Sequence, residues 1–287
     1  RGSARERQLV VDLVLRDEGP GEVFVMPAEG GEARRLTFLG SATRVCGWSR
    51  DGREVLFASS AGLPFARTSA LHAIPAEGGE TRALPMGLAV SISLGPNGGA
   101  VIGRNALDPA RWKRYRGGLT GDIWIDPAGD GDWRRLIDLP GNVAIPLWIG
   151  DRIYFVADHE GIGNLYSCLP TGEDLRRHTN HTEYYARFPS TDGRRIVYHA
   201  GADLYLFDPA TDNSTRIDVD FRSPRSQRKR RFIDPARFLQ HASLHPEGHS
   251  VAAIVRGKPF TLGNWEGAVL QYGDPGAVRY RLAEWLP

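Results

Sequence analysis

A short run of alternating aliphatic and aromatic residues recurs along the chain, and this repeat restricts the possible folds more than any other feature. Its copies occupy residues 22–27, 70–75, 122–127, 164–170, 203–209 and 258–261. Alternation with a period of two is typical of β-strands, and a repeat length of roughly 40 to 50 residues is typical of propeller blades. The sequence therefore predicts an all-β fold, a β-propeller of WD40-like repeats whose blades are four-stranded antiparallel sheets.

The turns between these runs support the strand prediction. Residues 28–31 and 76–79 both read AEGG, and the pairs Asp51-Gly52 and Asp192-Gly193 lie between other apolar runs. Glycine and aspartate are favoured in hairpin turns because such turns need positive φ angles or local side-chain hydrogen bonds. His72 replaces the central aromatic residue of the second run, and we expect it to be an interior or channel-facing histidine.

Charge and cysteine content narrow the function classes. The 36 basic and 34 acidic residues leave a formal net charge of +2, which gives no general attraction to nucleic acid or to an anionic membrane. No apolar run reaches the ~20 residues of a membrane-spanning helix. Cys46 and Cys168 each lie in an apolar strand pattern, which predicts buried free thiols, a reducing compartment and a cytoplasmic location.

Two segments interrupt the repeat and suggest the domain organisation. Residues 105–120 form an insertion before one of the repeated runs, and residues 221–237 are rich in arginine and poor in apolar residues. We predict one propeller over 1–219, a basic linker over 220–237, and a further blade with the start of another over 238–287. That further blade would belong to a following propeller or close the first one.

Several of these segments resemble the first propeller of the tricorn proteases. The resemblance rests on residues 103–118 (GRNALDPARWKRYRGG), 121–125 (GDIWI), 152–155 (RIYF), 174–179 (DLRRHT), 184–185 (YY) and 191–196 (TDGRRI), and it covers almost the whole chain. It implies a propeller of the six-bladed type, incomplete at its N-terminus because its first blade is missing. It also implies that the chain is a fragment whose catalytic serine and histidine lie beyond residue 287.

The resemblance further implies a function. The chain would be the non-catalytic propeller region of a tricorn-like serine peptidase (peptidase S41), serving as a substrate or product channel and as a domain scaffold. Its partners would be oligopeptides passing through the channel, the second propeller and the protease domains, with homo-oligomer formation in the full-length protein. No cofactor, nucleic acid or membrane is expected. The full-length protein would be a hydrolase, although this chain lacks catalytic residues.

Two other readings stay open at this point. The chain could be a stand-alone TolB-like propeller whose face binds a protein partner, since the blade pattern is shared by many propellers. It could also be an enzyme with a site in the propeller channel. No Gly-x-Ser-x-Gly sequence is present, so the sequence gives no local support for a nucleophile of the α/β-hydrolase type.

The candidate substrate-binding residues lie in two segments. In tricorn proteases two adjacent arginines of a first-propeller loop hold the substrate's C-terminal carboxylate, a role suited to guanidinium groups. The matching segment 40–45 contains Arg44 alone. The other candidates are the alternating cations and aromatics Arg111, Trp112, Lys113, Arg114, Tyr115 and Arg116. This pattern also suits single-stranded nucleic acid, or a structured insert whose two aromatic rings pack on a neighbouring blade.

Two clusters of titratable residues resemble a metal site or an acid–base site when each is considered by itself. His178, His181 and Glu183 have a metal-like spacing, but an outer strand followed by a turn does not supply the four ordered ligands of a structural zinc site, so no metal is assigned. Asp158, in the run Asp-His-Glu, is expected at a hairpin tip where its side chain bonds its own backbone. No catalytic residue is predicted in the chain.

Overall fold

The computed structural model describes residues 8–13, 20–220, 222, 234–274, 276 and 278–286, with the backbone alone for 8–13. It divides into two compact units, residues 1–219 and 220–287. Apart from a 3-10 turn (η2, Pro96–Gly98) and one turn of α-helix (α1, Pro235–Phe238), the regular structure of the described residues is β-sheet. The predicted all-β class is therefore confirmed. Within these ranges no helix is long and apolar enough to cross a membrane.

The first unit begins with three sheets whose strands are antiparallel. The strands of the first sheet are β1 (Gln8–Leu13), β2 (Glu22–Pro27) and β3 (Arg34–Arg35). Those of the second are β4 (Thr43–Trp48), β5 (Glu54–Ser59), β6 (Ala70–Pro75) and β7 (Arg82–Leu88). Those of the third are β8 (Ser91–Leu94), β9 (Ala100–Arg104), β10 (Asp122–Asp126) and β11 (Arg134–Arg135). In each sheet the strands lie side by side in chain order, as hairpins require.

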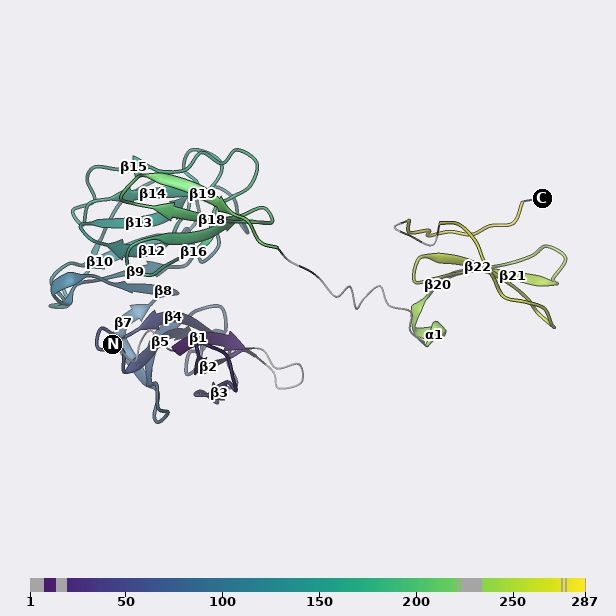
Figure 1. The fold of residues 1–287 in the computed structure, drawn as a ribbon, viewed down its shortest axis with the longest axis horizontal. Helices are drawn as coiled ribbons and strands as arrows, with labels where there is room; N and C mark the ends of the chain where they lie inside the picture. Colours follow the sequence, from purple (N-terminus) through teal and green to yellow (C-terminus); the bar gives the residue numbers. More distant parts are fainter. Residues whose placement is uncertain are drawn as a thin grey trace. The chain divides into compact units, whose positions relative to one another are not determined.

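Two further antiparallel sheets complete the described part of this unit. The fourth sheet contains β12 (Val143–Ile149), β13 (Arg152–Ala157), β14 (Asn164–Cys168) and β15 (Arg176–Arg177). The fifth contains β16 (Arg187–Thr191), β17 (Ile196–Ala200), β18 (Asp203–Asp208) and β19 (Asn213–Ile217). The first strand of each sheet contacts the preceding sheet, so the sheets follow one another in chain order (Figure 1). The prediction of successive four-stranded antiparallel propeller blades is confirmed.

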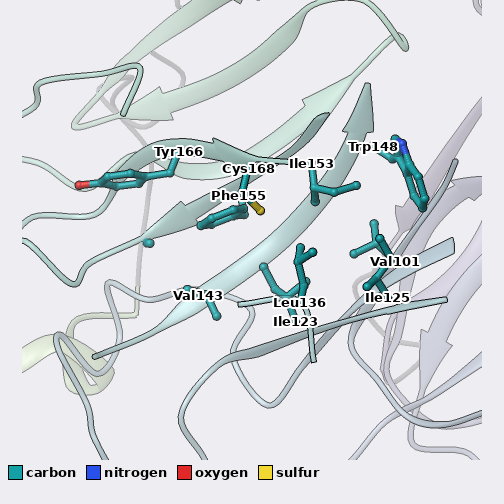
Figure 2. Packing of buried hydrophobic residues seen from close by; sticks show 11 residues of the cluster. Val101, Ile123, Ile125, Leu136, Val143, Trp148, Ile153, Phe155, Tyr166 and Cys168 are labelled. Carbon is teal, nitrogen blue, oxygen red and sulfur yellow. The ribbon is translucent and has the colours of Figure 1, made fainter. Parts of the chain in front are cut away.

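Apolar side chains of neighbouring sheets form a shared core. Figure 2 shows one such cluster, in which β9 and β10 contribute residues that pack with those of β12, β13 and β14. Its largest fully buried members are Phe155 and Tyr166, whose rings stack with centroids 6.5 Å apart. Burying an aromatic or aliphatic side chain of this size stabilises a fold by about 1.5–3 kcal/mol. The core therefore joins consecutive sheets into one unit.

Neither Cys46 nor Cys168 is in a disulfide, as the sequence predicts. Cys168 is fully buried in this core, and burial raises the pKa of its thiol to about 11. Cys46, on β4, is only half-buried. The prediction of a buried thiol is therefore confirmed for Cys168 and wrong for Cys46, because the strand that carries Cys46 is partly exposed along its length.

The second unit contains one four-stranded antiparallel sheet. Its strands are β20 (Leu239–Leu244), β21 (Ser250–Val255), β22 (Lys258–Gly263) and β23 (Leu270–Gln271). Asp234 caps α1 by accepting a hydrogen bond of 3.1 Å from the Ala236 N–H. Most of the predicted basic linker 220–237 lies outside the described residues. The assignment of the sheet to a second propeller stays a prediction.

Candidate functional site

The insert between β9 and β10, residues 105–120, is held on the first unit by a buried ion pair. Its Asp108 carboxylate accepts two hydrogen bonds from the Arg187 guanidinium at the start of β16, and the Nε to Oδ1 distance is 3.0 Å. The Asp108 side chain is only 4% exposed. Pairing with this carboxylate raises the pKa of Arg187. Two parallel bonds fix both the distance and the orientation of the groups, so the insert is tied to the fifth sheet.

A second anchor joins the insert to the fourth sheet. The fully buried Asp158 carboxylate accepts hydrogen bonds from the Arg114 N–H (2.6 Å) and the Asn142 N–H (2.7 Å). The Asn142 side chain donates to the Trp112 carbonyl (2.8 Å) and accepts from the Gly121 N–H (3.2 Å). Backbone groups of an irregular segment are thereby satisfied without a strand or helix.

These contacts correct the expectation for Asp158. Its carbonyl closes the hairpin turn by accepting from the Gly161 N–H (3.0 Å), but its carboxylate binds the insert and the strand-entry residue Asn142 instead of its own turn. The reason is that the insert folds over the β13–β14 hairpin and presents an N–H group there. Arg114 adopts a positive φ of 53° at this contact.

The anchored insert borders a cleft of about 940 Å³. The cleft is lined by Ala110 and Lys113 from the insert, by residues 180–185 and Arg187, and by residues 200–203 and Tyr205. The Lys113 ammonium lies 5.6 Å from the centre of the Tyr185 ring, within the range of a cation–π contact. The cleft is lined by charged groups of both signs, which are Lys113, Arg187, Glu183 and Asp203. A space of this size is typical of sites for small molecules or short peptide segments.

The structure brings only part of the predicted substrate-binding set to this cleft. Lys113 lines it, whereas Arg111, Trp112, Arg114 and Arg116 are exposed elsewhere on the insert. The Trp112 and Tyr115 rings pack against each other with centroids 5.2 Å apart, and Trp112 is 57% exposed. The anchoring to the neighbouring blade is therefore made by backbone groups of the insert and by Asp108.

Arg44 occupies a different part of the first unit. It lies on β4, opposite Ala58 of β5, in the second sheet, and it does not line the cleft. The segment that the sequence suggested as a loop, 40–45, is already in strand conformation from Thr43 onwards. Arg44 and the insert therefore do not belong to one binding site.

A Ser–His–Asp arrangement, which the sequence analysis did not identify, lies at the edge of the fourth sheet. The His178 Nε2 is 2.7 Å from the Ser167 Oγ, and the His178 Nδ1 is hydrogen-bonded to the Asp212 carboxylate of the β18–β19 turn. The order of these groups is that of a hydrolase triad. Ser167 and His178 are 11 positions apart, whereas Asp212 lies 34 positions beyond His178, and only the packing of two sheets brings Asp212 to the histidine.

Burial makes this arrangement unsuitable for nucleophilic attack. Ser167 is 0% exposed in the middle of β14, and its Oγ also accepts a hydrogen bond of 2.8 Å from the Arg152 Nε. The His178 ring packs against both Tyr154 and Phe207, and this burial lowers its pKa although Asp212 opposes the shift. A substrate carbonyl has no access to the Oγ. The three groups therefore connect two neighbouring sheets.

The metal-like triple of the sequence is also engaged in other contacts. The His181 Nε2 lies 3.0 Å from the Tyr198 hydroxyl, and its ring meets Tyr205 edge-on. Glu183 lines the cleft, whereas His178 binds Ser167 as described above. Each of these residues thus faces a different set of neighbours.

Comparisons with known proteins agree with this architecture. Residues 13–213 match the family described as the tricorn protease N-terminal beta propeller domain. A tricorn protease homolog of Saccharolobus solfataricus is 36% identical over 268 residues, which cover 93% of this chain and 24% of that protein. The chain thus spans about a quarter of the length of the curated relatives that it matches.

Solved structures show the same relationship. The crystal structure of the tricorn protease superposes with a TM-score of 0.78 and 32% identity, covering 97% of this chain and 27% of that one. TolB from Acinetobacter baumannii superposes with a TM-score of 0.57 at 12% identity, covering 92% and 65%, and this likeness shows the fold alone. The family resemblance of the sequence is thereby confirmed, and the chain belongs to the tricorn protease family through its N-terminal β-propeller domain.

Proposed function

We propose that this chain is the non-catalytic propeller region of a tricorn-like serine peptidase that degrades oligopeptides. One observation carries the proposal: nearly the whole chain aligns with the tricorn protease structure but covers only 27% of it. Most of such a protein is therefore formed by other residues. The buried Ser167 supports the same conclusion, because the Ser–His–Asp arrangement of the described residues has no room for a peptide.

The cleft beside the insert is the proposed contact surface for passing oligopeptides. Its Lys113 ammonium and its tyrosine rings suit the carboxylates and apolar side chains of short peptides. We extend the proposal to the exposed cations and aromatics of the insert and to Arg44, which would meet peptides or adjoining domains. The predicted contact residues outside the cleft are Arg44, Arg111, Trp112, Arg114, Tyr115 and Arg116.

The proposed partners follow from the family. They are a second propeller and the protease domains, which this propeller would position as a scaffold, and further copies of the full-length protein. The reduced state of Cys46 and Cys168 supports a cytoplasmic location, where thiols stay reduced. The near-neutral net charge supports the expectation that neither nucleic acid nor a membrane is a partner.

A stand-alone scaffold of the TolB type is the second candidate function. The superposition on TolB favours it as far as the fold is concerned. In that case the chain would bind a protein partner by itself and would not depend on peptidase domains. The 32% identity to the tricorn protease over 97% of the chain favours the first proposal.

The proposal is tested by comparing peptide hydrolysis by the full-length protein with that by the chain 1–287. We expect the full-length protein to cleave fluorogenic oligopeptides in a manner that a serine-directed inhibitor abolishes, and the chain 1–287 alone to show no cleavage. The Lys113→Ala variant of the full-length protein should raise KM for acidic peptides, whereas the Arg195→Ala variant, changed outside the cleft, should not. Inhibitor-sensitive cleavage by the isolated chain would overturn the proposal. Absence of cleavage by the full-length protein, together with capture of a specific protein partner, would favour the TolB-type scaffold.

A further inference from the structure

The hairpin between β20 and β21 carries three potential metal ligands at alternate positions. His245, Glu247 and His249 each offer one donor atom, and these atoms all lie within 4.8 Å of one another. The turn is closed by the Gly248 N–H, which donates to the His245 carbonyl (2.8 Å), and Gly248 adopts a φ of 75°. The three side chains therefore extend from one well-defined turn.

Glu247 and His249 already have the spacing of two ligands on one ion. The Glu247 Oε2 is 3.5 Å from the His249 Nε2. Two donors that bind a tetrahedral metal at about 2.0–2.1 Å lie about 3.3 Å apart. The other ring nitrogen of His249 is 2.8 Å from the Ser250 hydroxyl. If this Nδ1–H donates to that oxygen, the Nε2 lone pair faces Glu247, which is how outer-shell hydrogen bonds orient metal-binding histidines.

His245 is the third ligand, and its ring is held by aromatic contacts. It stacks on His249 with ring centroids 4.0 Å apart and meets Trp285 edge-on at 4.7 Å. The Trp285 indole is itself fixed by donating to the Ser243 carbonyl (3.0 Å). Its donor atom lies within 4.8 Å of the other two, so binding of one ion by all three residues requires the His245 ring to move closer to them.

We propose that His245, Glu247 and His249 bind a divalent first-row transition ion such as Zn²⁺, Ni²⁺ or Cu²⁺. Two imidazoles and one carboxylate suit these ions, whereas Mg²⁺ and Ca²⁺ prefer sets of oxygen ligands. Glu247 and His249 are exposed, so water completes the coordination. Affinity should follow the usual order for such sites, with Cu²⁺ bound more tightly than Zn²⁺ or Ni²⁺.

Metal titration of the chain 1–287 tests the site. Co²⁺ binding is followed by its visible absorption, and Zn²⁺ binding by calorimetry, in a buffer that does not chelate. The expected result is one equivalent bound, with affinity about tenfold or more weaker in Glu247→Gln and in His249→Gln. The matched control is His241→Gln, because His241 lies in the same sheet and binds Glu284 (3.0 Å) outside the cluster. Circular dichroism confirms that each variant is folded.

A second readout places the ion beside Trp285. Cu²⁺ bound at His245 should quench the fluorescence of this tryptophan, and the Trp285→Phe variant should lose that part of the quenching while it still binds Zn²⁺. Unchanged affinity in both Glu247→Gln and His249→Gln would overturn the proposal. So would a wild-type chain that binds Co²⁺ and Zn²⁺ no more tightly than the His249→Gln variant.

Discussion

Asp108 and Arg187 lie 79 positions apart in the sequence and form a two-bond ion pair that joins the insert to the first strand of the fifth sheet. The Asp108 side chain is almost completely buried, whereas the Arg187 side chain is 36% exposed. The pair is therefore asymmetric, because loss of the arginine leaves a buried charge without its partner. Loss of the aspartate leaves a cation that water can still reach.

The first prediction follows from this asymmetry. Arg187→Ala should lower the free energy of unfolding by about 2–4 kcal/mol, because removing one partner of a buried pair is strongly destabilising. Urea unfolding of the chain 1–287 measures the effect. The control is Arg195→Ala, since Arg195 pairs with Asp192 where both side chains are 52% exposed, and such pairs contribute about 0–1 kcal/mol. Equal effects of the two substitutions would contradict the role assigned to Arg187.

The second prediction concerns the buried Asp158. Asp158→Ala should release the insert, because the Arg114 and Asn142 N–H groups lose their acceptor, and each unsatisfied buried group costs about 1–3 kcal/mol. Trypsin should then cleave after Arg111 and Lys113 faster than in the wild type. Asp138→Ala is the control, because the Asp138 side chain is 81% exposed. An unchanged cleavage rate in Asp158→Ala would show that the insert is held by other contacts.

Burial of neutral histidines predicts a loss of stability in mild acid. The pKa of His72 is lowered from 6.5, mainly by burial, and burial also lowers those of His159, His178 and His181. The unfolded state therefore binds more protons below about pH 6.5, so stability is greatest above that pH and falls as the pH decreases towards the folded-state values. Carboxyl groups contribute little to this change above pH 5.

The His72→Phe variant isolates one part of this pH dependence. Phenylalanine matches the aromatic residue at the equivalent position of β2, and the His72 ring already stacks on Phe57 with centroids 5.4 Å apart. The variant should therefore fold, and its unfolding free energy should fall less steeply than that of the wild type between pH 7 and pH 5. Urea titrations at a series of pH values measure the slope. A slope that matches the wild type would mean that His72 binds its proton equally well in the folded and unfolded states.

The repeated apolar run predicted much of the fold because strand identity depends on local alternation. The predicted runs 22–27, 70–75 and 122–127 correspond to β2, β6 and β10. The contacts of Asp158 could not be predicted in this way, because its partner Arg114 lies 44 positions away and is brought close only by the path of the insert. Long-range pairings of this kind depend on how two sheets pack.

The same limit explains why the Ser–His–Asp arrangement could not be predicted from the sequence. Ser167 lies on β14 and His178 directly follows β15, but Asp212 reaches them from the next sheet. His245, Glu247 and His249 did carry a local signal, since their alternation across a hairpin turn places them close together. His178 and His181 have a similar spacing in the sequence but face different neighbours, so spacing alone does not identify such a cluster.

The final prediction tests whether the role of Ser167 is structural or catalytic. Ser167→Ala should lower the free energy of unfolding by about 1–3 kcal/mol, because the Arg152 and His178 groups lose a buried partner. It should leave peptide hydrolysis by the full-length protein unchanged at temperatures where the variant stays folded, since a fully buried hydroxyl cannot meet a peptide carbonyl. The measurement is kcat with a fluorogenic peptide, and Ser190→Ala, a change on another strand, is the control. A loss of kcat of a hundredfold or more in a folded Ser167→Ala protein would mean that this triad-like arrangement opens to substrate, because removal of a catalytic nucleophile has effects of at least that size.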